Sequence, residues 1–223
     1  LQTANSVRFD VRAGGFTLPA LTTATQPDFV LGSGIGTLTL PLLTTATQPK
    51  FIIATGSNLT ANGLTSVDGA TIDVATGGTL SIPNVDDITT STVTLAGSAQ
   101  LTTAPLSDIN GSRFLLSNGA AFSNITDTAY TGTHTATTGV STGLGFVLFE
   151  AKGVDGVGTG SLLNLQSLTN LTTTISQGNS QTELTIHAAD KGTIDLRNVT
   201  TAGMVAGQPL NRLKFFIEGG ANG

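Results

Sequence analysis

The chain has 223 residues, a net charge of −5 and only 10% charged residues, and it contains no cysteine. Its mean hydropathy of +0.22 excludes intrinsic disorder, which combines low hydrophobicity with high net charge. The acidic balance and the scattered Lys and Arg residues exclude the basic surface of a nucleic-acid-binding protein. The absence of cysteine excludes disulfides, thiolate metal sites and thiol nucleophiles.

A nearly identical repeat opens the chain. The heptapeptide LTTATQP occupies residues 21–27 and returns at 43–49, and a Phe follows each copy at the same distance, as Phe29 and Phe51. Self-similarity at a fixed period is typical of repeat architectures. Thr, Gly, Asn and β-branched residues are abundant, and no window carries a 3.6-residue apolar stripe. The pattern therefore favours short strands over helices.

Beyond these copies the sequence diverges, but apolar residues continue at a step of 21. Four such columns are Leu43, Leu64, Val85 and Leu106; Phe51, Ile72, Val93 and Phe114; Ile53, Val74, Leu95 and Leu116; and Ala46, Val67, Ile88, Ile109 and Tyr130. A helix-free coil that closes every 21 residues stacks its strands in parallel, about 4.8 Å apart. The step predicts an all-β, single-stranded parallel β-helix (β-solenoid), which we expect to be right-handed with about eight to ten turns.

The repeat changes after residue 119. Residues 120–145 are rich in Thr and Gly and poor in apolar residues, so we expect an irregular loop there. A step of 31 then predicts wider coils. It matches Leu163 with Ile194 and Leu165 with Leu196, and it also matches Leu184 with Phe215 and Ile186 with Ile217. We interpret 1–223 as one continuous solenoid, with regular narrow coils over 1–119 and wider coils over 146–223.

The units GTLTLPLLTTATQ, GTLSIPNVDDITT, GSLLNLQSLTNLTT and GTIDLRNVTTA resemble the β-helical repeats of large secreted bacterial surface proteins, which are adhesin-like and filamentous-haemagglutinin-like. The resemblance covers most of the chain, but it lies in pattern and composition and brings no functional residues. It implies a structural or adhesin-like segment at the cell surface or outside the cell, with cell-surface glycans or other surface proteins as partners. Leucine-rich repeats share the Leu spacing of LLNLQSLTNL, but their helical half and fixed Asn are absent.

The chain begins without Met and shows no signal peptide, so we expect it to be a piece of a longer protein whose targeting segment lies elsewhere. Its longest apolar run, around Phe146–Phe149, is far too short to span a membrane. We therefore expect no membrane span in this piece and no nucleic-acid partner.

Two acidic residues form the candidate site that the repeat suggests. Asp87 and Asp108 are 21 residues apart and should stack on successive turns. A carboxylate pair could serve as acid and base in glycoside cleavage, or could ligate Ca²⁺. No Arg, Lys or His shares their columns, so a solvated turn is the simpler interpretation. We assign no catalytic residue, cofactor or metal, and keep a polysaccharide-binding or polysaccharide-cleaving protein (lyase or hydrolase) as the first alternative.

Three other features suggest sites less strongly. The only histidines, His134 and His187, are far apart in the sequence and neither has a second His at a metal-ligand spacing, so we expect surface or turn positions. The glycine-rich stretch 153–160 lacks the lysine of a phosphate-binding loop and is interpreted as an ordinary loop.

A last feature is a pair of Thr-x-Thr units, at 23–25 and 45–47, which together resemble the flat array of an ice-binding β-helix. The following turns replace these Thr residues by Ser and Asp. Ice binding is therefore the second alternative. The chain has no Trp and one Tyr, which gives little support for sugar binding by aromatic stacking.

Overall fold

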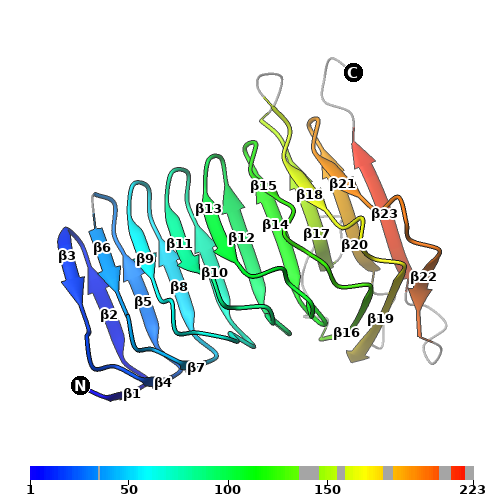
Figure 1. The fold of residues 1–223 in the computed structure, drawn as a ribbon. Helices are drawn as coiled ribbons and strands as arrows, with labels where there is room; N and C mark the ends of the chain where they lie inside the picture. Colours follow the sequence, from blue (N-terminus) through cyan, green and yellow to red (C-terminus); the bar gives the residue numbers. More distant parts are fainter. Residues whose placement is uncertain (35, 136–145, 155–158, 178–182, 206–211, 219–223) are drawn as a thin grey trace.

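The computed structural model describes residues 1–34, 36–135, 146–154, 159–177, 183–205 and 212–218. The described chain contains strands and no helix, and the coils stack in order from the N-terminus to the C-terminus at the opposite end (Figure 1). Neighbouring strands are parallel throughout the nine-stranded sheet, which is named the long sheet below. The all-β class and the stacked parallel solenoid are thus confirmed, while its handedness stays a prediction.

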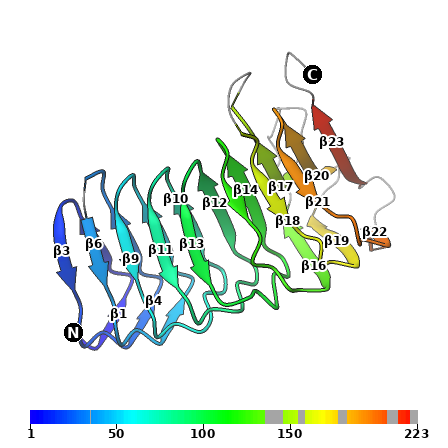
Figure 2. The ribbon, with the colours of Figure 1, turned by 45° about the horizontal axis from the view of Figure 1, so that its top comes forward.

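Three rows of strands run along the solenoid, one on each side of a coil (Figure 1 and Figure 2). The long sheet has nine strands: β2 (Arg8–Val11), β5 (Asp28–Leu31), β8 (Lys50–Ile53), β10 (Thr71–Val74), β12 (Thr92–Ala96), β14 (Arg113–Ser117), β17 (Phe146–Lys152), β20 (Glu183–Ala189) and β23 (Arg212–Glu218). The second row contains β3 (Gly14–Thr17), β6 (Gly36–Thr39), β9 (Asn58–Thr60), β11 (Thr79–Ile82) and β13 (Gln100–Thr103), then β15 (Ala121–Phe122), β18 (Leu162–Asn164) and β21 (Thr193–Asp195).

The third row is named the ladder face here. It begins with β1 (Thr3–Asn5), β4 (Thr23–Thr25) and β7 (Thr45–Thr47), and it ends with β16 (Ala129–Thr135), β19 (Asn170–Gln177) and β22 (Thr201–Met204). These six strands form two three-stranded sheets. In the coils between the two sheets, single parallel bridges join Ser66 to Asp87 and Asp87 to Asp108. Each coil therefore passes from the ladder face to the long sheet and then to the second row.

The register of the long sheet confirms the apolar columns. Phe51 pairs with Ile72, Ile72 with Val93, and Val93 with Phe114. All four side chains are fully buried. Two Phe rings of the preceding coils extend the column as a stack, with centroid separations of 5.3 and 5.5 Å. Because each such side chain contributes about 1.5–3 kcal/mol when it leaves water, contacts between coils supply the core.

The wider coils confirm one predicted pairing and correct another. Leu163 pairs with Ile194, as the step of 31 predicts. Ile186, however, pairs with Phe215 and not with Ile217, which is a step of 29 (186 to 215), so that prediction was wrong. Apolar residues alternate along β23, and a slip of two residues keeps every side chain on the same face. The sequence pattern alone therefore cannot distinguish the two registers.

The stretch predicted to be an irregular loop, 120–145, contains strands where the structure describes it. β15 pairs with β18, and β16 pairs with β19 over most of its length. Tyr130 is fully buried and His134 is 5% exposed, so β16 does have an inward face. That face carries one aromatic ring and one imidazole rather than aliphatic residues, which hid the strand from a search for apolar alternation. Residues 136–145 lie outside the described chain.

Buried serines satisfy backbone groups at the ends of the strands. Ser91 Oγ accepts a hydrogen bond from the Ala70 N–H (2.9 Å) and donates one to the Val67 carbonyl (3.1 Å). In the next coil, Ser112 Oγ accepts from the Ser91 N–H at 3.0 Å. Because a hydroxyl can donate and accept at once, each serine replaces backbone partners that the sheets do not provide.

The corner between the ladder face and the long sheet uses left-handed backbone. Six successive coils each have one residue at this corner with a φ between 46° and 72°. These residues are Ser6, Gln26, Gln48, Gly69, Thr90 and Gly111. Each of these residues donates its backbone N–H to a carbonyl of the following coil, as Thr90 does to Asn110 at 2.8 Å. Glycine adopts this conformation without steric cost, whereas a β-branched residue such as Thr90 is strained.

Replacing Val93 by Asp is expected to unfold the solenoid locally or entirely. The carboxylate would lie between Ile72 and Phe114 with no polar partner, at a cost of more than about 3 kcal/mol. The control is Thr92→Asp on the same strand, because Thr92 faces outward and pairs with Arg113. Urea unfolding of both variants is the measurement. Equal midpoints for V93D and T92D would contradict the assignment of inward and outward faces.

Candidate functional site

The two predicted acidic residues do stack. Asp87 and Asp108 form a parallel bridge on the ladder face and are both half-buried. Asp87 Oδ1 accepts a hydrogen bond from the Thr89 N–H at 3.0 Å. Asp108 Oδ1 accepts from both the backbone N–H and the side-chain amide of Asn110, at 2.9 and 2.8 Å. Each carboxylate thus closes a turn within its own coil, which is a structural use of the group.

Asp87 has an unusual electrostatic environment. Burial raises the pKa of its carboxyl group above the ordinary value, and the neighbouring carboxylates of Asp68 and Asp108 raise it further, while the Thr89 N–H opposes the shift. Thr89 Oγ1 meanwhile donates to Asp68 Oδ1 at 2.9 Å. A raised pKa is the kind of shift that a general acid requires. The groups described around Asp87 in these turns are backbone amides, the Thr89 side chain and the carboxylates of Asp68 and Asp108. These groups do not form the combination of general acid, general base and cationic side chain that polysaccharide cleavage would use.

A surface groove lies beside this acidic column. It encloses about 400 Å³ along the ladder face, and its walls carry six Thr hydroxyl groups, one Asn side chain and one exposed Val. The lining residues are Thr89, Thr90, Asn110, Gly111, Thr131, Gly132, Thr133, Thr172, Thr174 and Val205. These residues come from five successive coils, so the groove runs parallel to the solenoid axis.

Glycine forms the floor of this groove. A Cβ atom on Gly132 would lie 2.8 Å from His134 Nε2 and 2.9 Å from the Gly111 Cα atom, so no larger residue fits there. A Cβ atom on Gly111 would lie 3.1 Å from Thr90 Cγ2, at a φ of +72° that disfavours side chains. The sequence analysis did not reveal this site because it interpreted residues 120–145 as an irregular loop. The 21-residue step, extended into that stretch, would have placed Gly132 beside Gly111.

Directly beneath the groove, His134 is buried and not at the surface, so the predicted surface position was wrong. Its Nε2 atom lies 3.0 Å from the Tyr130 hydroxyl, which donates its only proton to the Ser112 carbonyl at 2.9 Å. We therefore assign the Nε2–H tautomer, with His134 as donor. Burial, with the nearby positive charge of Arg113, lowers the pKa of His134 to about 4. Burial also raises the pKa of Tyr130.

His187 is also buried, again in contrast to the predicted surface position. It is 3% exposed on β20, and its Nδ1 atom lies 2.9 Å from Glu150 Oε1. Its Nε2 atom lies 3.5 Å from Glu218 Oε2 without forming a hydrogen bond. The two carboxylates face opposite edges of the ring. Among the described residues, no group of three or more His, Asp or Glu side chains is arranged to hold a metal ion.

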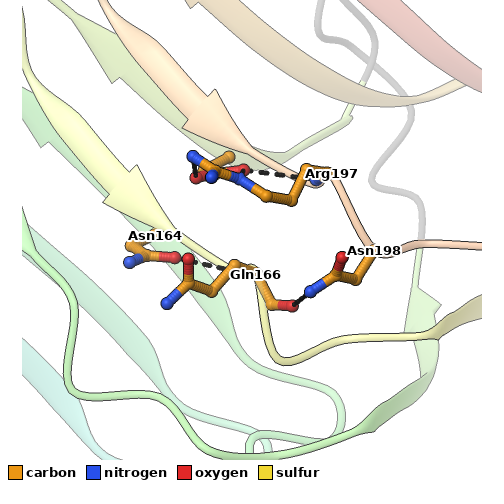
Figure 3. Close-up of polar contacts among 5 residues, drawn as sticks. Asn164, Gln166, Arg197 and Asn198 are labelled. Atoms are coloured by element: carbon orange, nitrogen blue, oxygen red, sulfur yellow. Dashed lines mark hydrogen bonds and ion pairs between the residues drawn. The ribbon is translucent and has the colours of Figure 1, made fainter.

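A polar corner joins the two wide coils at the ends of β18 and β21 (Figure 3). Asn198 Nδ2 donates to the Gln166 carbonyl at 2.7 Å, and the Gln166 N–H donates to Asn164 Oδ1 at 2.9 Å. Arg197 binds Asp195 through Nη2 and Nε, at 2.6 and 3.0 Å. These hydrogen bonds lower the pKa of Asp195 and raise that of Arg197. The corner is thus a linkage between coils.

Comparisons with protein-family models, curated proteins and solved structures find no match for this chain. Nothing in the described part of the chain forms a helix with the length and apolarity needed to cross a bilayer. The glycine-rich stretch 153–160 falls partly outside the described residues, at 155–158, so its interpretation as a loop stays a prediction.

The solenoid is expected to lose stability as the pH falls from 6.5 towards 4. In this window the unfolded chain protonates His134 with the ordinary pKa of 6.5, while the folded chain resists protonation down to about 4. Protons then favour the unfolded state. His134→Phe preserves the stacked ring and should flatten this part of the profile. Melting temperatures between pH 7.5 and 4 test it, and parallel curves for the two proteins would contradict it.

Proposed function

We propose that this chain is a non-catalytic, structural or adhesin-like segment of a larger bacterial surface protein, located outside the cell. One observation carries the proposal: a series of apolar columns inside the solenoid supports a repeated display of mostly short polar side chains along one outer face. A scaffold needs a rigid support and a repeated surface, and needs no reactive centre. The support comes from contacts between neighbouring coils, so the rod keeps the same faces along its length.

The repeated surface is the ladder face, with two outward columns. The first column contains Thr3, Thr23, Thr45, Ser66, Asp87, Asp108, Ala129, Asn170 and Thr201. The second column contains Asn5, Thr25, Thr47, Asp68, Thr89, Asn110, Thr131, Thr172 and Gly203. Hydroxyl, amide and carboxylate groups dominate both columns. Such groups bind hydrated, hydrogen-bonding partners, in keeping with cell-surface glycans.

The same columns weigh against ice binding. Within these two columns, Thr occupies both positions only on β4 and β7, and β1 carries one Thr and one Asn. Asp68 and Asp87 then bring carboxylates to the two columns in the following coils. The run of Thr pairs in these columns is therefore broken after two coils, whereas a mixed, mostly polar surface extends along the face.

The competing enzymatic function depends on Asp87, whose raised pKa is the one observation in its favour. Beads coated with the chain should attach to polysaccharide-coated surfaces and release no new reducing ends or unsaturated products. Asp87→Asn should change neither result. The matched control is Asp73→Asn, an exposed Asp on β10. Sugar release that D87N abolishes and D73N preserves would overturn the non-catalytic proposal.

A further inference from the structure

The groove on the ladder face is extended along the axis and is not a round pocket. Its lining begins at Thr89 and ends at Val205, four coils later. Four steps between coils, at about 4.8 Å each, give it a length of about 19 Å. A site of this length parallel to the rod suits a linear polymer lying along the ladder face more than a compact small molecule.

The lining carries hydrogen-bonding groups without charge. No Asp, Glu, Lys, Arg or His is among its residues. Thr89 and Thr90 donate their hydroxyl protons to protein oxygens, and Thr131 donates to Asn110 Oδ1 at 2.9 Å. Such contacts fix the walls in place before any ligand binds, which lowers the entropic cost of binding.

Other hydroxyl groups are available for a ligand. Within the described part of the chain, the hydroxyls of Thr133, Thr172 and Thr174 make no hydrogen bond to protein. These side chains belong to the third and fourth of the five coils that line the groove. Val205, which is 57% exposed, offers an apolar contact there. Hydroxyl groups beside one apolar contact match the alternating hydroxyl and C–H surfaces of a sugar ring.

The backbone of the groove shows strain at one position. Thr90 is β-branched and has a φ of +55°, where its neighbours in the same corner column are the glycines Gly69 and Gly111. Strained backbone of this kind is concentrated at binding sites, where the surrounding structure maintains it. Thr90 places a methyl and a hydroxyl group at the groove wall, which glycine could not do.

We propose that this groove binds a neutral, linear polysaccharide along the solenoid axis. The proposal rests on the adhesin-like function above and specifies its ligand class and its site. Acidic polymers are disfavoured because Asp68, Asp87 and Asp108 lie in the adjoining columns of the same face. Hydrogen bonds rather than aromatic stacking provide the recognition, so each site binds weakly and repeated engagement along a polymer strengthens attachment.

Native gels containing a dissolved polysaccharide test the proposal, since binding slows the protein. Linear β-glucan, xylan and galactomannan are the neutral probes, polygalacturonate the acidic probe and chitosan the basic one. We expect retardation by at least one neutral polymer and none by polygalacturonate. The double variant Thr172→Val and Thr174→Val keeps the shape of the groove and removes two free hydroxyls. Its affinity should fall at least about fivefold.

The matched control is Thr92→Val and Thr94→Val, two outward positions of β12 in the long sheet, away from the ladder face. It should bind as tightly as the unaltered chain, and the melting temperatures of both variants should show that they fold. The proposal is overturned if no neutral polymer retards the chain, if a charged polymer is preferred, or if both double variants lose affinity equally. Polysaccharide attachment that survives the groove variant would reject this groove while leaving the adhesin-like function intact.

Discussion

Contact between the inward side chains of successive coils is the interaction on which this structure depends. A coil of about 21 residues cannot bury its own apolar face, so a residue such as Val93 is covered only because Ile72 and Phe114 lie on either side. Where a coil has a described neighbour on one side only, the same type of inward residue is exposed, as with Ile217 at 82% and Phe16 at 48%. The outward positions have no such requirement, which explains why the LTTATQP units diverge while the apolar columns persist.

This division between inside and outside also locates the functional surface. The left-handed corner brings each coil round in the same way and aligns its outward residues in columns. On the ladder face these columns carry Thr, Asp and Asn. Asp87 and Asp108 belong to them as turn-forming residues, whereas the uncharged groove opens beside them, with the backbone of Gly111 and Gly132 as its floor. Rigidity and binding thus arise from the same repeat.

The sequence predicted the strand pairing correctly in the part of the chain where the apolar residues recur at a constant step. Residues such as Ile72 recur at a constant step with period-two alternation, and both signals reflect a single buried face. It was uninformative where contacts depend on coils of unequal length. His187 meets Glu150, 37 residues earlier, and Glu218, 31 residues later, so local spacing could not show that it is buried. The position of Phe215 depended on a two-residue slip that leaves the hydrophobic pattern unchanged.

Distances between spin labels on the ladder face test the stacked-coil structure most directly, because the chain has no cysteine to compete with engineered label sites. Thr25 and Thr131 are five coils apart, which corresponds to about 24 Å. Moving the second label from Thr131 to its strand partner Thr172 adds 41 residues of chain but one coil (131 to 172). The structure predicts that the distance then increases by only about 5 Å. An unchanged distance, or an increase of several coil spacings, would contradict parallel stacking.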